Sequence, residues 1–150
     1  MSTVLLVHHA PSPRLRVLLA ALEEGVRHPD LEGVELESVP ALAATSDHVL
    51  RADGFVLLTP ANFGYMSGAL KHFFDTTYYT CLDAVAGRPY ALCVHGDDDS
   101  TGAVASVERL AGGWGLEKVA PATVVAGEPD RERLATASEA AATVGAHLLA

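Results

Sequence analysis

The chain has 150 residues, of which 49% are hydrophobic and 19% charged, and its formal net charge at pH 7 is −9. This length and apolar content predict a single domain, residues 1–150, with a full hydrophobic core, and they exclude a disordered chain. The negative charge argues against nucleic acid as a partner, because proteins that bind phosphate backbones gather Lys and Arg on one face.

The N-terminal segment and the cysteines indicate a compartment. The apolar run from Val4 to Val7 has no basic segment before it and is too short for a signal-peptide core or a membrane span. Cys81 and Cys93 stand among apolar or aromatic residues and are interpreted as reduced core residues, although one disulfide is compatible with the sequence. We therefore expect a cytoplasmic protein with no membrane partner.

The first third of the chain alternates between strand and helix patterns. Val4 to Val7 predicts a strand, and apolar residues at helical spacing from Leu15 to Val26 predict a helix. Ser12-Pro13 starts that helix well, with Ser as N-cap and Pro at the first helical position. Residues 34–39 alternate between polar and apolar, which is typical of an edge strand, and a short helix is expected near 46–51.

The remaining two thirds repeat the alternation. Continuous apolar runs predict central strands, and Ser67 is a candidate N-cap. The predicted elements are strands at 54–58, 90–94 and 119–125, the last interrupted near Pro121, and helices after Ser67, from about Ser100 to Gly112, and from Pro129-Asp130 to Leu148.

Five strands, each followed by a helix, predict the α/β class. Right-handed crossovers then give a five-stranded parallel sheet covered on both faces, which is a three-layer αβα sandwich. An edge-like second strand beside buried central strands favours the strand order 2-1-3-4-5, the flavodoxin-like arrangement.

A ligand of such a sheet is expected beyond the carboxyl ends of the strands, between the first and third. Three loops should meet there: His8 to Arg14, Thr59 to Met66, and His95 to Gly102. In the first loop, a helix N-terminus, Ser12 and Arg14 suit a phosphate. The alternative is that Ser12 only caps the helix and that Arg14 is solvated.

The other two loops differ in character. Asn62, Phe63, Gly64 and Tyr65 suit a flat heterocycle, although a loop that only closes the core is the alternative. The acids 97–99 beside His95 suggest a metal, but consecutive acids commonly begin a helix, and no structural-zinc spacing is present. No metal site is predicted.

The stretch ADGFVLLTPANFGYMSGALKHFFD, from Ala52 to Asp75, resembles the signature of the flavodoxin-like NAD(P)H-dependent FMN reductases. The resemblance implies an oxidoreductase with non-covalent FMN and NAD(P)H as co-substrate, which passes hydride through flavin N5 to a quinone-like or other small acceptor. It implies no catalytic side chain, and only His95 is kept as a candidate donor near the flavin or substrate. By position, the implied contacts are His9, Ser12 and Arg14 for phosphate, Pro60, Ala61, Asn62, Phe63, Gly64, Tyr65 and Met66 for the flavin ring, and His95, Gly96 and Asp97 for the far side of the pocket.

One feature departs from the family pattern. Pro11 and Pro13 have no N–H, and His8-His9-Ala10 replaces the usual small polar residues of the phosphate loop. Two alternatives therefore stay open: a one-electron carrier of flavodoxin type, and a flavodoxin-like binding or regulatory module that has lost FMN.

The third helix ends in Tyr78 and Tyr79, just beyond Phe73 and Phe74. These rings either form the interface of a homodimer, as is common among related reductases, or close the core. A homodimer is thus a possibility that the sequence leaves open.

Overall fold

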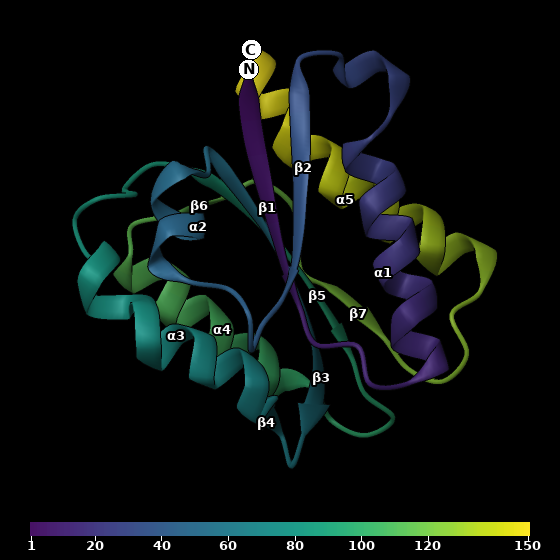
Figure 1. Cartoon of the computed structure of the whole chain (residues 1–150). Coiled ribbons are helices and arrows are strands. Elements are labelled where there is room, and N and C mark those ends of the chain that lie inside the picture. The colour runs from purple at the N-terminus through teal and green to yellow at the C-terminus, as the bar shows by residue number, and fades with distance from the viewer.

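The computed structural model describes residues 1–150 and places one sheet between two layers of helices (Figure 1). Four parallel strands, β1 (Ser2–His8), β2 (Val34–Pro40), β3 (Gly54–Asn62) and β5 (Pro89–His95), lie in the order β2-β1-β3-β5. The next position is shared by β6 (Glu117–Lys118) and β7 (Thr123–Val125), which both pair with β5 in parallel. This order confirms the predicted 2-1-3-4-5 arrangement.

Two details of the sheet differ from the prediction. The fifth strand was expected over 119–125, but the strand is confined to β7, because Pro121 has no N–H to give to a ladder. The loop expected after the third strand is instead a hairpin. In it, β3 continues to Asn62 and turns back into β4 (Tyr65–Met66), which is antiparallel. The sheet is therefore not wholly parallel.

The helices form the two outer layers, which confirms the three-layer sandwich (Figure 1). Ser12 and Ser67 are N-caps as predicted, and each side chain accepts an N–H from the residue three positions later. The helices are α1 (Pro13–Val26) and α5 (Arg131–Leu149) on one face, α2 (Ser46–Arg51), α3 (Gly68–Cys81) and α4 (Thr101–Gly113) on the other, and a short 3₁₀ turn, η1 (Pro29–Leu31).

Alternate residues of the central strands feed two separate cores. On β1, Leu5 packs with the core under α3 and α4, and Leu6 packs with the core under α1 and α5. Trp114 stacks against Tyr78 in the first of these cores. Cys81 and Cys93 are buried in opposite cores and are not bonded to each other, so the predicted core role of the cysteines is confirmed.

The two ends of the sandwich differ. Both chain termini lie at the upper end of Figure 1, while the carboxyl ends of the parallel strands and the β3–β4 hairpin lie at the lower end. This lower end is the edge at which the sequence predicts a ligand. None of the helices combines the length and the apolar character needed to cross a membrane.

Candidate functional site

The loop between β1 and α1 is held by its own backbone. The N–H of His9 donates to the carbonyl oxygen of Leu58 at 3.0 Å, which ties the loop to β3. The hydroxyl oxygen of Ser12 accepts the N–H of Leu15 at 3.2 Å. Ser12 is therefore the N-cap of α1, as the start of that helix predicts, and its contact with a phosphate remains a prediction.

Few amide donors remain at this end of α1. Pro11 and Pro13 have no N–H, and the amides of His9 and Leu15 are used within the protein. The amides left for a ligand are those of Ala10, Ser12 and Arg14. They lie at the positive end of the helix dipole, so a small anion can still be bound here, with fewer donors than an uninterrupted loop offers.

The side chain of Arg14 is held by two carboxylates. Its Nε lies 2.9 Å from Oε1 of Glu128, and its Nη1 lies 3.4 Å from Oδ1 of Asp97. The hydrogen bond and the charge of Glu128 raise the pKa of Arg14 above its ordinary value, and Asp97 adds to this. Arg14 thus lies at the predicted edge of the sheet. It is not simply solvated, because its guanidinium group is already paired with two carboxylates of the protein.

A second loop, between β7 and α5, joins the site. Gly127 donates its N–H to Asp97 Oδ1 at 3.0 Å, and its carbonyl oxygen lies 2.8 Å from His95 Nε2. Because a carbonyl only accepts, Nε2 of His95 carries the proton in this contact. His95 therefore fastens two loops together, and its implied contact with a flavin remains a prediction.

Sequence reasoning missed the contribution of Gly127 and Glu128. The signal for it was available in the predicted strand order, because the fifth strand runs beside the fourth and its carboxyl end must reach the same edge. The ion pair itself joins residues 114 positions apart, which local patterns do not reveal.

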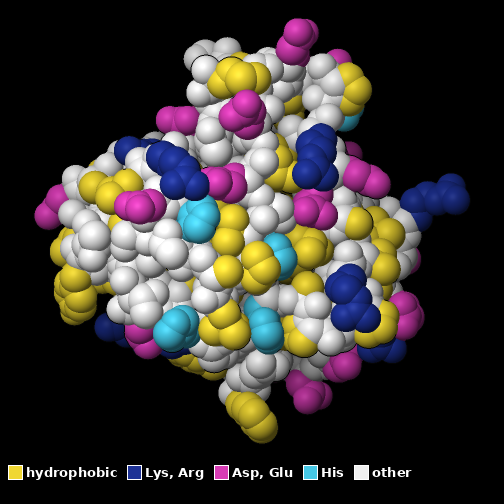
Figure 2. Space-filling model, in the orientation of Figure 1, with side chains coloured by type: hydrophobic (Ala, Val, Ile, Leu, Met, Phe, Trp, Pro, Cys, Tyr) yellow, Lys and Arg dark blue, Asp and Glu magenta, His cyan; other side chains and the backbone are white.

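The β3–β4 hairpin turns at Phe63 and Gly64, whose φ angles are +52° and +72°. Positive φ at both central residues is the requirement of a type I′ hairpin turn. Phe63 pays a steric cost there that Gly64 avoids, because bulky residues rarely adopt positive φ. The Phe63 side chain is nonetheless 107% exposed, and Figure 2 shows apolar surface projecting at the lower end of the molecule, where the hairpin lies.

The hairpin is positioned by close backbone contact with α4. A Cβ at Gly102 would lie only 2.0 Å from the carbonyl oxygen of Gly64, so only glycine fits at the first turn of α4. Below the turn, the hydroxyl of Thr59 accepts the N–H of Ser67 at 2.9 Å. The exposed ring of Phe63 is therefore presented by a rigid base.

The loop after β5 packs equally closely against the end of β3. A Cβ at Gly96 would lie 2.7 Å from Ser100 Oγ and 2.9 Å from the Cβ of Ala61. Ser100 is only 6% exposed, and its hydroxyl has no hydrogen-bond partner in the protein. Its oxygen is shielded from solvent, so it is an unpaired polar group that a ligand atom reaches only if this loop moves.

These features fit a flavin site better than they fit loops that only connect strands to helices. The N-terminus of α1 offers amides for a phosphate, and the hairpin offers an exposed ring and backbone. The neighbouring cavity of about 510 Å³ lies on the outer side, between α4 and β7, rather than in the crevice between β1 and β3. Its lining is acidic, which disfavours a phosphate there.

The structure brings the three predicted loops together, but not every predicted residue faces outward. Asn62, Phe63, Gly64 and Tyr65 are exposed on the hairpin. Met66 is buried in the core under α3 and α4, and its contact with a ligand remains a prediction. The other predicted residues lie at the same edge in different states of burial: His9, Ser12, Arg14 and Ala61 half-buried, Pro60, His95 and Gly96 buried, and Asp97 exposed.

Comparison with known sequences gives two matches. The family described as NADPH-dependent FMN reductase matches residues 11–128, which is more than half of the chain. A protein named flavodoxin from Aquifex aeolicus (strain VF5) is 29% identical over 115 residues, and these cover 77% of this chain and 53% of that protein. The chain thus spans about half the length of this curated relative.

Solved structures share the fold. Oxidised flavodoxin 1 from Bacillus cereus has a TM-score of 0.81 at 16% identity, and the match covers 97% of this chain and 99% of that one. The Flv1 flavodiiron core from Synechocystis sp. PCC6803 also has a TM-score of 0.81, at 15% identity, and the match covers 99% of this chain but 36% of that one. At these identities the likeness shows the fold alone.

Proposed function

Because the chain belongs to the NADPH-dependent FMN reductase family, we propose that it binds FMN non-covalently at the carboxyl edge of its sheet. FMN bound there supplies hydride transfer, from NADPH or NADH to a small acceptor of quinone-like chemistry. The observation that carries the proposal is the hairpin turn at Phe63 and Gly64, which holds an exposed aromatic ring in a strained conformation beside the loops after β1 and β5.

Each side of the edge has its own task in this proposal. The amides of Ala10, Ser12 and Arg14 bind the phosphate at the positive end of α1. The turn at Phe63 and Gly64 lies against the flavin ring and offers backbone N–H groups to its edge. The loop after β5, with His95, Gly96 and Asp97, closes the far side of the pocket. No side chain is assigned to proton transfer, because the chemistry belongs to the cofactor.

A one-electron carrier of flavodoxin type is the second candidate. It is supported by the name of the Aquifex aeolicus relative and by a net charge of −9, which suits a basic protein partner. The two candidates share the flavin site and differ in the electron donor, since a carrier accepts electrons from a protein and a reductase accepts hydride from a nicotinamide.

An absorption spectrum of the purified protein tests both candidates. FMN is added first, and NADPH or NADH is added afterwards without oxygen. Flavin bands that shift on binding and bleach within seconds of adding a nicotinamide support the reductase. Bands that shift but bleach only with a chemical reductant support the carrier. A spectrum equal to the sum of protein and free FMN contradicts both, and it favours a module that has lost FMN.

We also propose a homodimer and a cytoplasmic location. Tyr78 packs against Trp114, whereas Tyr79 is 83% exposed on α3 and offers a ring to a second copy of the chain. Two unpaired, buried cysteines suit a reducing compartment. Sedimentation of wild type and of Tyr79→Lys tests the dimer, which the variant should weaken.

A further inference from the structure

Arg14 stands in the first turn of α1, at the end where free amides remain. Its guanidinium group contacts carboxylates from two other loops, Asp97 after β5 and Glu128 after β7. The ion pair is accessible to solvent, because the side chains of Arg14, Glu128 and Asp97 are 38%, 79% and 66% exposed. A charged ligand can therefore reach the guanidinium group and compete with the carboxylates.

The two carboxylates are not equivalent. Asp97 also accepts the N–H of Gly127, so the protein holds it in place whether or not Arg14 is present. Glu128 makes its hydrogen bond to Arg14 and has no other partner in the protein. Its side chain is also the more exposed of the two carboxylates, at 79% against 66%, although its 2.9 Å contact with Nε of Arg14 is the shorter one. Glu128 is thus the partner that a phosphate displaces most easily.

We propose that Glu128 determines how strongly this chain prefers flavins with a phosphate over flavins without one, by competing with the phosphate for Arg14. This inference rests on the proposed function. A phosphate that binds the guanidinium group of Arg14 has to displace Glu128 from it, and the ion pair given up weakens the binding of the phosphate. Riboflavin has no phosphate, so Glu128 leaves its affinity unchanged.

The expected gain in FMN affinity on removing the Glu128 carboxylate is limited by the exposure of the ion pair and by salt. Exposed ion pairs are weak and screened, so removing the carboxylate should tighten FMN binding by about two- to fivefold at low ionic strength. At about 0.5 M salt the gain should shrink, because the screening length falls from about 10 Å at 0.1 M to about 4 Å and exposed ion pairs weaken with it.

The test measures the dissociation constants of FMN and riboflavin by quenching of flavin fluorescence. Wild type is compared with Glu128→Gln at low and high salt. Glu132→Gln is the matched control, because it removes the same charge near the start of α5 from a residue paired with Arg133 rather than Arg14. We expect Glu128→Gln to bind FMN more tightly, with riboflavin unchanged, and Glu132→Gln to behave as wild type.

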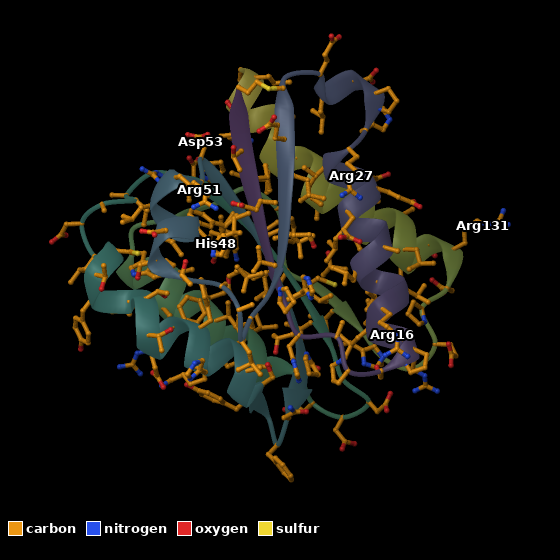
Figure 3. All side chains as sticks on the ribbon, in the orientation of Figure 1. Arg16, Arg27, His48, Arg51, Asp53 and Arg131 are labelled. Atoms are coloured by element: carbon orange, nitrogen blue, oxygen red, sulfur yellow. The ribbon has the colours of Figure 1, made fainter.

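A second pair of variants shows whether the effect passes through Arg14. The gain from Glu128→Gln should vanish in an Arg14→Gln background and persist in an Arg16→Gln background. Arg16 is exposed at the lower end of α1 (Figure 3) and contacts neither carboxylate. A gain that survives in Arg14→Gln overturns the proposal, because Glu128 then acts by its charge alone.

The remaining outcomes separate this inference from the proposed function. If wild type binds FMN and Glu128→Gln binds it no more tightly, or tightens riboflavin equally, the inference fails and the proposed function stands. If FMN binds to Glu128→Gln but not measurably to wild type, the inference is supported in its strongest form. If neither protein binds either flavin, both fail together.

Discussion

Phe63 is the residue at which local preference and structure disagree most. Its φ of +52° belongs to a region that asparagine and glycine tolerate and that a bulky side chain rarely adopts. Its ring is fully exposed, so burial of the ring does not offset the strain. Strain of this kind persists when the surroundings impose it, and it gathers at binding sites. A contact between this ring and the proposed FMN would explain why the strain is kept.

Replacing Phe63 by asparagine should therefore separate stability from binding. Asn relieves the positive φ, so the free energy of unfolding in urea should rise by about 0.5–1 kcal/mol. Loss of the ring should weaken FMN binding by about three- to tenfold, as measured by fluorescence quenching. Phe63→Tyr keeps the ring and should change neither quantity. A ring with no role in binding would leave the affinity of Phe63→Asn at the wild-type value.

At the scale of elements, the site depends on how closely α4 approaches the hairpin. Gly102 allows the first turn of α4 to lie against the carbonyl of Gly64, and Gly96 allows the loop before α4 to lie against Ala61. At Gly102 the neighbour is the backbone of Gly64, which cannot move aside without shifting the hairpin, whereas at Gly96 the neighbours are the side-chain atoms of Ser100 and Ala61. The helix and the hairpin therefore form one packed unit.

Gly102→Ala tests this packing. The added methyl would lie 2.0 Å from the carbonyl oxygen of Gly64, so helix or hairpin must shift, and the variant should lose about 1–3 kcal/mol of unfolding free energy. Gly112→Ala is the matched control on the same helix, since nothing lies within 4 Å of its added methyl. It should gain up to about 1 kcal/mol from helix propensity. Equal effects of the two variants in urea unfolding would refute the packing argument.

At the scale of the whole molecule, the architecture followed from periodicity and caps. Alternation of apolar runs with helical spacing predicts the sandwich, and Ser12 and Ser67 mark helix starts that the structure confirms. The hairpin was missed because its antiparallel return, β4, is only two residues long and carries no strand pattern of its own. The three-loop edge was predictable from topology, but the Arg14–Glu128 pair was not, because it depends on where α5 begins in space.

The stability of the whole fold should depend on pH through His8, which ends β1. Partial burial lowers the pKa of His8 below its ordinary value of 6.5, His9 lowers it further, and nearby Glu23 acts in the opposite direction. Between 6.5 and the lower folded pKa, the unfolded chain binds more protons at this residue than the folded protein does. The contribution of neutral His8 is therefore complete above pH 6.5 and is lost as the pH falls through that window.

His8→Gln removes the titrating group and keeps a polar side chain of similar length. The free energy of unfolding in urea, measured at intervals from pH 8 to pH 5, should fall less steeply below pH 6.5 for the variant than for wild type. Above that pH the two curves should run parallel, because His8 is neutral in both the folded and the unfolded chain. Parallel curves across the whole range would mean that His8 titrates equally in both states and that its burial has no influence on the fold.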